Sequence, residues 1–134
     1  MIYLDSSALV KLAHLEKESE QLEGWLRRRR SERRVASALV EVELPRALRR
    51  CTADIAFRTA IVLANVDRVD IKATIRAAAA AFGDPALRSL DAIHLATALE
   101  LRDDVTALVS YDRRMLAAAV AQGLPIASPG ADQP

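Results

Sequence analysis

The chain is poor in cysteine, in aromatic residues and in net charge, and each shortage excludes something. Cys51 is the only cysteine, which excludes an intramolecular disulfide and a cysteine-ligated metal cluster. Aromatic residues make up 4% of the sequence, so a core must be built from Ala, Leu, Val and Ile. A formal net charge of +1 gives no overall argument for nucleic acid binding.

Long apolar runs are missing as well. No stretch approaches the length that spans a membrane, and no basic leader stands at the start of the sequence. We therefore expect a cytoplasmic protein that makes no contact with membranes.

What the sequence does contain is a regular alternation of short apolar strands with helical segments. The expected strands are 1–5, 33–36, 66–71, 106–109 and 124–127, and the expected helices are 7–14, 16–30, 37–51, 52–65, 72–82, 89–102 and 112–122. This order predicts an α/β fold, a three-layer α/β/α sandwich with a central, mostly parallel sheet of four or five short strands. We expect one domain over 1–134, with a frayed tail at 129–134.

Two acids directly follow apolar strands. Asp5 ends the first strand, and Asp112 comes just after Leu108 and Val109. The carboxyl ends of neighbouring parallel strands face one crevice, where open α/β sheets place their ligand sites. Each acid can equally be the N-cap of the helix that follows it, and local sequence does not decide between the two roles.

A third acid, Glu43, lies on the helix expected over 37–51. With Leu39 at i−4 and Ala47 at i+4, it borders the apolar face, whereas Glu41 points elsewhere, so the geometry favours Glu43. The alternative is a partly exposed glutamate whose stem packs on the core.

The fourth acid, Asp91, begins a helix that is apolar nearly all round and must therefore be buried. Its place in the first turn suits the helix dipole, which explains a tolerated acid but not why so apolar a helix starts with one. Asp91, His94, Thr97 and Glu100 form one slanting polar stripe. We interpret His94 as a hydrogen-bonded helix residue near the cleft rather than as a metal ligand.

Four carboxylates in one sheltered cleft are unfavourable unless a cation neutralises them. Oxygen ligands select hard divalent ions, so Mg²⁺ or Mn²⁺ is expected rather than zinc. Such a site suits phosphoryl transfer, because the metal can activate a water and stabilise the leaving oxygen of a phosphodiester. Ser7 and Ser110 each lie two positions from an acid and either support the site or are turn residues.

Five segments over nearly the whole chain match the pattern of one known family. They are IYLDSSALVK at 2–11, ELPRAL at 43–48, LRSLDAIHLATA at 87–98, VSYDRR at 109–114 and GLPI at 123–126. In this order they resemble the PIN-domain ribonucleases, specifically the VapC toxins of bacterial toxin–antitoxin pairs. The resemblance implies a homodimeric endoribonuclease that cleaves structured RNA, such as tRNA or rRNA, and is silenced in a hetero-oligomer by an antitoxin protein that masks the cleft.

The resemblance also assigns roles to the acids. It implies that Asp5, Glu43, Asp91 and Asp112 form the acidic metal site, and it settles the choice of Glu43 over Glu41. On this basis we expect Asp5 and Asp91 to be the primary metal ligands. Glu43 and Asp112 would be ligands or outer-shell groups. Ser7 matches the family's hydroxyl residue near the first acid, and Ser110 stands where threonine is commoner.

RNA contacts are less well marked in the sequence. Arg46, Arg49 and Arg50 follow Glu43 on its helix, and Arg113 and Arg114 follow Asp112, so we expect these arginines at the cleft rim. The basic run 27–34 either grips phosphates or is a solvated helix end far from the cleft. No aromatic platform for base stacking is visible. For the antitoxin we expect an apolar groove among the early helices.

Two other functions stay open. One is a non-catalytic PIN-like module that only binds a protein partner, which metal titration would reveal by an absence of binding. The other is an aspartyl-phosphate phosphotransfer domain. A phosphatase of that class needs a second aspartate at position 7, where this chain has Ser7.

Overall fold

The computed structural model describes residues 1–131 of the chain, and the sheet within them is organised around its first strand. The strands are β1 (Ile2–Leu4), β2 (Arg34–Ser37), β3 (Asp67–Val69), β4 (Ala107–Val109) and β5 (Ile126–Ala127). They form one sheet in the order β3-β2-β1-β4-β5, and every neighbouring pair is parallel. The predicted fold class is confirmed.

The position of β1 in the middle of this order creates a crevice. Ile2 pairs with Arg34 of β2 on one side and with Ala107 of β4 on the other. The chain adds strands outward from β1 to β3 and then returns to the opposite side of β1 for β4. The carboxyl ends of β1 and β4 therefore flank a topological switch point, where this class of sheet binds its ligands.

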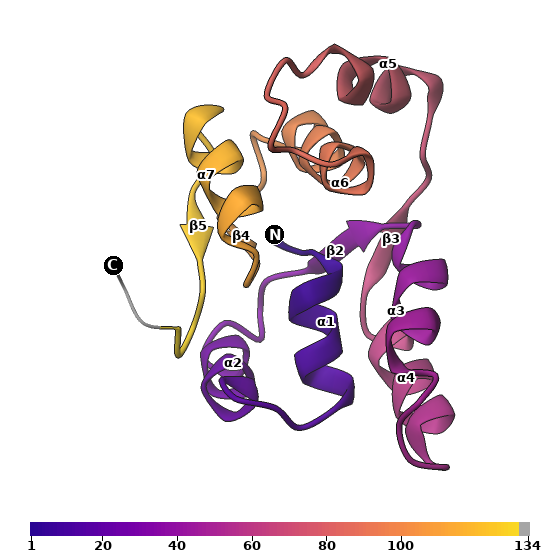
Figure 1. Cartoon of the computed structure of the whole chain (residues 1–134). Helices are drawn as coiled ribbons and strands as arrows, with labels where there is room; N and C mark the ends of the chain where they lie inside the picture. Colours follow the sequence, from indigo (N-terminus) through magenta and orange to yellow (C-terminus); the bar gives the residue numbers. More distant parts are fainter. Residues whose placement is uncertain (132–134) are drawn as a thin grey trace.

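Helices cover both faces of the sheet (Figure 1). They are α1 (Ser6–Ala13), α2 (Ser19–Arg27), α3 (Val40–Leu48), α4 (Ile55–Ala64), α5 (Ala73–Ala81), α6 (Ser89–Glu100) and α7 (Arg113–Ala121). α1 to α4 pack on one face and α6 and α7 on the other, with α5 against the outside of α6. Because side chains alternate along a strand, Ile2 and Leu4 join the first core while Tyr3 joins the second.

Some boundaries differ from those expected. Ser37 is the last residue of β2 rather than the N-cap of a helix, and α3 begins only at Val40. The Ser37 hydroxyl still accepts a hydrogen bond from the Leu39 N–H at 3.1 Å, within the turn that leads into α3. α2 is also shorter than expected, because Glu18 before it adopts a left-handed conformation with φ of 71°.

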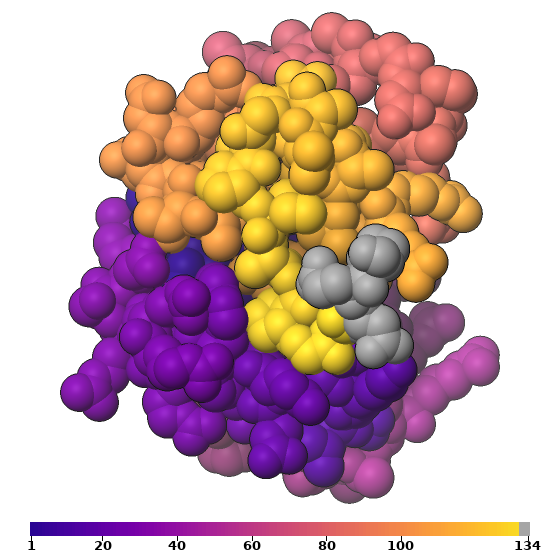
Figure 2. Space-filling view, turned by 90° about the vertical axis from the view of Figure 1, so that its left-hand side faces the viewer, coloured from indigo at the N-terminus to yellow at the C-terminus, as the bar shows by residue number. Residues whose placement is uncertain are grey.

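The C-terminal segment lies against the body of the protein. Figure 2 shows it in yellow between the violet surface that contains α2 and the orange surface of the later helices. The Tyr111 hydroxyl donates a hydrogen bond to the Pro129 carbonyl at 2.7 Å, and Gly130 lies close to the Gln21 side chain. Residues 132–134 of the expected tail lie outside the described residues. Of the helices that are described, none combines the length and apolar character needed to cross a bilayer.

Candidate active site

Asp5 lies at the carboxyl end of β1 and is 4% exposed. Its Oδ1 accepts a hydrogen bond from the Ala8 N–H at 3.1 Å, which makes Asp5 the N-cap of α1, and a second from the Ser7 hydroxyl at 2.6 Å. Its Oδ2 accepts a hydrogen bond from the Ser110 hydroxyl at 2.5 Å. Capping and a site role are therefore compatible, because the cap occupies only one carboxylate oxygen.

Ser7 and Ser110 hold Asp5 from two different elements. Each hydroxyl donates its proton to Asp5, and each oxygen accepts a backbone amide, Tyr111 N–H at 2.9 Å for Ser7 and Asp112 N–H at 3.0 Å for Ser110. The orientation of both hydroxyls is thereby fixed. The two serines join the start of α1 to the connection between β4 and α7, and they support the site as expected.

The buried environment of Asp5 disfavours the ionised form of its carboxyl group. Burial raises the pKa of the Asp5 carboxyl above its ordinary value, while nearby His94 and the hydrogen bonds from Ser110 and Ser7 oppose that rise. A cation bound beside Asp5 would favour the ionised form.

Asp91 lies in the first turn of α6, with its side chain 20% exposed. Burial raises the pKa of Asp91, and the carboxylates of Asp112 and Asp5 raise it further, against the opposing charge of Arg88. Within residues 1–131 the buried Oδ2 of Asp91 has no hydrogen-bond partner, and the Arg88 Nε lies 3.8 Å away. An unpartnered buried carboxylate oxygen is costly, and in proteins such a group commonly has a catalytic role or binds water or an ion.

Glu43 reaches the same region from α3 on the other face of the sheet. Its Oε1 is 2.6 Å from Nε2 of His94, and its Oε2 accepts a long hydrogen bond of 3.5 Å from the Ser6 hydroxyl. Glu41, by contrast, is exposed and pairs with Arg68 at 3.4 Å. The two glutamates therefore point to different places, and Glu43 is the one near Asp5.

Tyr3 and His94 are two members of the site whose partnership the sequence did not reveal. The Tyr3 hydroxyl lies 2.7 Å from Nδ1 of His94 and accepts a hydrogen bond from the Ser37 N–H at 3.2 Å. A signal for them was available: Tyr3 carries the one polar group in an otherwise apolar strand, and His94 lies on a helix that must be buried. His94 is a hydrogen-bonded residue beside the acids.

Asp112 is the N-cap of α7, where its Oδ1 accepts the Arg114 N–H at 2.9 Å and the Met115 N–H at 3.5 Å. Its charge acts on Asp91, so it also borders the acidic cluster. Within residues 1–131 no three His, Cys, Asp or Glu side chains have an arrangement that could hold a metal ion. The four acids thus gather at one edge of the sheet without converging on one point.

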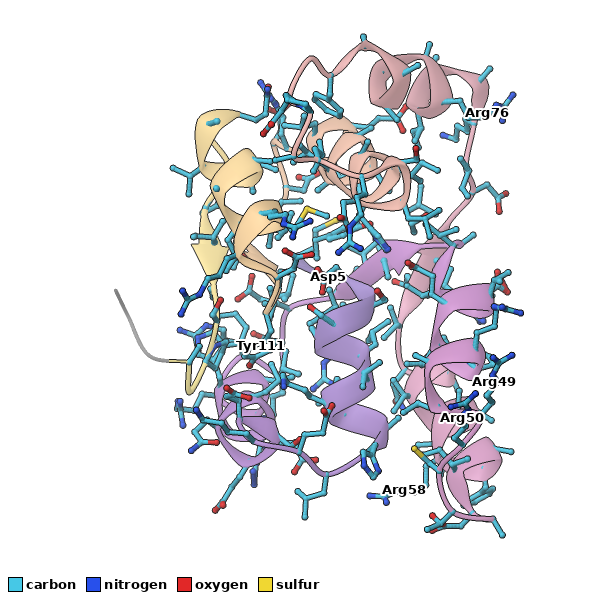
Figure 3. The ribbon with its side chains drawn as sticks, viewed as in Figure 1. Asp5, Arg49, Arg50, Arg58, Arg76 and Tyr111 are labelled. Carbon is cyan, nitrogen blue, oxygen red and sulfur yellow. The ribbon has the colours of Figure 1, made fainter. Side chains whose placement is uncertain are left out.

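The expected arginines divide into two groups. Arg113 and Arg114 begin α7 beside Asp112, Arg46 lies one turn after Glu43, and all three are exposed. Figure 3 shows Asp5 between the helical layers, while Arg49 and Arg50 point outward beyond the far part of α3. Placing Arg49 and Arg50 at the cleft rim was wrong, because α3 carries them away from the acids.

The basic run 27–34 lies at the other end of the sheet. Arg34 is the first residue of β2 and pairs with Ile2 at the start of β1, so this run borders the amino ends of the strands. The acids border the carboxyl ends. An RNA bound at the acids would reach this run only by crossing the molecule.

The acids are not spaced as metal ligands among the described residues, but the chemistry of the donors suits a divalent cation. Four carboxylates with two serine hydroxyls are the hard oxygen donors that Mg²⁺ and Mn²⁺ prefer. The buried Oδ2 of Asp91, which has no hydrogen-bond partner among the described residues, favours such an ion, and burial raises the pKa values of both Asp5 and Asp91.

Comparison with known proteins identifies relatives over the whole chain. The family model of the PIN domain matches residues 2–121. Ribonuclease VapC35 of Mycobacterium tuberculosis is 51% identical over 132 residues, which cover 97% of this chain and 98% of that protein. Ribonuclease VapC46 of the same species is 44% identical over 130 residues, covering 96% of this chain and 97% of that one.

Two solved structures share the fold. The M. tuberculosis VapC20 toxin, which cleaves the sarcin–ricin loop, superposes with a TM-score of 0.71 at 17% identity, over 88% of this chain and 95% of that chain. A toxin–antitoxin complex from Klebsiella pneumoniae superposes with a TM-score of 0.70 at 23% identity, over 96% of this chain and 98% of that chain.

Proposed function

This chain belongs to the VapC ribonucleases of the PIN-domain family and is an endoribonuclease of toxin type, and we propose that Asp5, Glu43, Asp91 and Asp112 are its catalytic acids. The observation that carries this proposal is the gathering of all four acids at the carboxyl edge of β1 and β4. The resemblance noted from the sequence is confirmed at the level of family and fold.

PIN-domain ribonucleases generally depend on divalent metal, and we propose Mg²⁺ or Mn²⁺ for this chain. Asp5 and Asp91 would be the ligands, with Glu43 and Asp112 as further ligands or outer-shell groups. Bound there, the ion would neutralise the charge on the scissile phosphodiester and make a water more acidic.

The serines, Glu43 and the arginines near the acids have separate roles in this proposal. Ser7 and Ser110 keep the Asp5 carboxylate in one orientation, so no rearrangement is needed when substrate arrives. Glu43 holds its Oε1 against His94 and has only a long contact at Oε2, so this carboxylate can accept the proton of the attacking water. Arg113, Arg114 and Arg46 attract the phosphates of the bound strand, and Arg88 beside Asp91 joins them at the rim.

We propose a structured RNA, of the tRNA or rRNA class, as the substrate. The VapC20 relative's action on the sarcin–ricin loop supports this class. The exposed arginines near the acids also favour recognition of the RNA backbone and its shape.

We further propose that the chain forms a homodimer and is silenced by an antitoxin protein in a hetero-oligomer. Large apolar side chains are exposed on two packed helices, Val42 of α3 at 59%, and Phe57 and Ile61 of α4 at 70% and 48%. Exposed apolar side chains on two neighbouring helices suit a protein partner. The toxin–antitoxin complex from K. pneumoniae supports an antitoxin as that partner.

The test is cleavage of cellular RNA by the purified protein, with ends mapped by sequencing. We expect cleavage with Mg²⁺ or Mn²⁺, none with a chelator, and none from Asp5→Asn or Asp91→Asn. Asp67→Asn is the matched control, because Asp67 is exposed, pairs with Arg33 and lies at the opposite end of the sheet. Full activity in both site variants would overturn the assignment, and a wild-type protein that binds no metal would favour the non-catalytic module.

A further inference from the structure

A continuous chain of hydrogen bonds runs from the backbone of β2 to the carboxylate of Glu43. The Ser37 N–H donates to the Tyr3 oxygen at 3.2 Å, the Tyr3 hydroxyl meets Nδ1 of His94 at 2.7 Å, and Nε2 of His94 meets Oε1 of Glu43 at 2.6 Å. Tyr3 is fully buried, and His94 is 1% exposed. Neither side chain reaches the cleft, so neither can touch RNA.

The direction of each bond follows from what each group can do. A backbone N–H only donates, so the Tyr3 oxygen is an acceptor for Ser37 and its single proton is free to go to His94. The Glu43 carboxylate only accepts, so Nε2 of His94 carries the proton that points at Glu43, and Nδ1 of the neutral imidazole accepts the hydrogen bond from the Tyr3 hydroxyl. Burial also raises the pKa of Tyr3 well above its ordinary value, so the phenol keeps the proton that this arrangement needs.

This series of hydrogen bonds also connects the two faces of the sheet. Tyr3 comes from β1 and His94 from α6 on one face of the sheet, whereas Glu43 comes from α3 on the other face. Glutamate has three rotatable side-chain bonds, and its other contact here is the long one to Ser6 at 3.5 Å. The bond from His94 is therefore what holds the Glu43 carboxylate in place.

We infer that Tyr3 and His94 are positioning residues that act through Glu43, with Tyr3 fixing the imidazole so that its Nε2–H holds the Glu43 carboxylate at the cleft. This inference rests on the proposed function and adds two buried residues to it. Partners behind a catalytic or metal-binding group commonly matter by about 10–100-fold in activity or metal affinity.

Tyr3→Phe tests the side chain of this hydrogen-bond series that lies farthest from Glu43. It removes one hydroxyl, leaves the buried ring and lies away from the substrate. We expect kcat for RNA cleavage to fall about tenfold while KM stays within about twofold. Tyr111→Phe is the matched control, because it removes a hydroxyl that donates to the Pro129 carbonyl, and it should keep full activity.

Two replacements of His94 separate positioning from packing. Glutamine puts its amide nitrogen near the place of Nε2 and can still donate to Glu43, whereas asparagine matches Nδ1 and cannot reach Glu43. We expect His94→Gln to retain at least about tenfold more kcat, and tighter Mn²⁺ binding by calorimetry, than His94→Asn. Equal losses in folded samples of both variants, judged by circular dichroism, would overturn the inference.

A spectroscopic measurement keeps the inference independent of activity. The ¹⁵N spectrum of the imidazole reports which ring nitrogen carries the proton, and His14→Gln leaves His94 as the one remaining histidine. At about pH 8 we expect the Nε2–H form in the His14→Gln protein and a mixture of tautomers after adding Tyr3→Phe. An Nδ1–H form would overturn the inference, whereas an inactive wild-type protein with the Nε2–H form would overturn the proposed function alone.

Discussion

The Ser110 hydroxyl donates a 2.5 Å hydrogen bond to Oδ2 of Asp5, although the two residues are 105 positions apart in sequence. This bond ties the carboxyl end of β4 to that of β1, at the switch point of the sheet. With Ser7 and the Ala8 N–H on the other oxygen, Asp5 has three donors and one fixed orientation. We propose that this fixed carboxylate serves as a metal ligand in addition to capping α1.

Ser110→Ala should lower kcat about tenfold, because Oδ2 of Asp5 loses its donor and the carboxylate can rotate. Ser110→Thr keeps a hydroxyl at the same place and should retain most of the activity. Cleavage rates measured at saturating metal compare the two. Equal rates for the alanine and threonine variants would show that this hydroxyl does not orient Asp5.

Glu43→Gln and Glu41→Gln form a pair on one helix. Glu43 faces His94 and the other acids, whereas Glu41 is exposed and paired with Arg68. We expect Glu43→Gln to lose at least about 100-fold in kcat, as removal of a general base does, and Glu41→Gln to match the wild type. Steady-state cleavage rates of the two variants measure this difference. A larger loss of kcat in Glu41→Gln than in Glu43→Gln would make Glu41 the catalytic glutamate.

The difference in stability between Asp91→Asn and the wild type should depend on pH when no metal is present. The pKa of Asp91 is raised in the folded protein, so the folded state prefers the protonated acid. The contribution of Asp91 to the free energy of unfolding is therefore full below its unfolded pKa of about 3.9 and is lost as pH rises through the folded pKa.

At neutral pH in chelator, Asp91→Asn should consequently unfold a few degrees above wild type, since about 1 kcal/mol moves the midpoint by about 4 °C in a small domain. The difference should shrink towards pH 4. Thermal unfolding followed by circular dichroism at both pH values measures it. A variant less stable than wild type at neutral pH would mean that Asp91 is not penalised by its surroundings.

Arg113→Ala should weaken RNA binding and reduce its salt dependence. Removing one arginine–phosphate interaction with a single strand lowers the slope of log K against log salt by about 0.7. Arg30→Ala, in the run at the amino ends of the strands, should leave the slope unchanged. Fluorescence anisotropy with the inactive Asp5→Asn protein measures both slopes. A larger effect of Arg30→Ala would show that RNA binds at the amino ends of the strands instead of at the acids.

Strand and helix order could be read from the sequence because the apolar periodicities are strong and because Asp5 and Asp112 cap α1 and α7. The meeting of Asp5 and Asp112 followed from parallel pairing alone, since both end strands that flank one crevice. Boundaries were less predictable where one residue serves two elements. Ser37 has the chemistry of a helix cap, yet its backbone belongs to β2.

The partnership of Tyr3, His94 and Glu43 could not be predicted in the same way. It depends on the position of α6 along β1 and on the position of α3 at the edge of the sheet, and both are set by tertiary packing. A tyrosine in an apolar strand reads as core, and so does a histidine on a buried helix. Their hydrogen bonds appear only when the two layers are assembled.

The central claim is that the four acids form one divalent-metal site, and calorimetric titration of Mn²⁺ into the purified protein tests it most directly. We predict saturable binding to wild type, unchanged binding to the distant control Asp67→Asn, and affinity at least about tenfold weaker in Asp91→Asn, whose wild-type Oδ2 is buried without a partner. The same isotherm for wild type and Asp91→Asn would contradict the account.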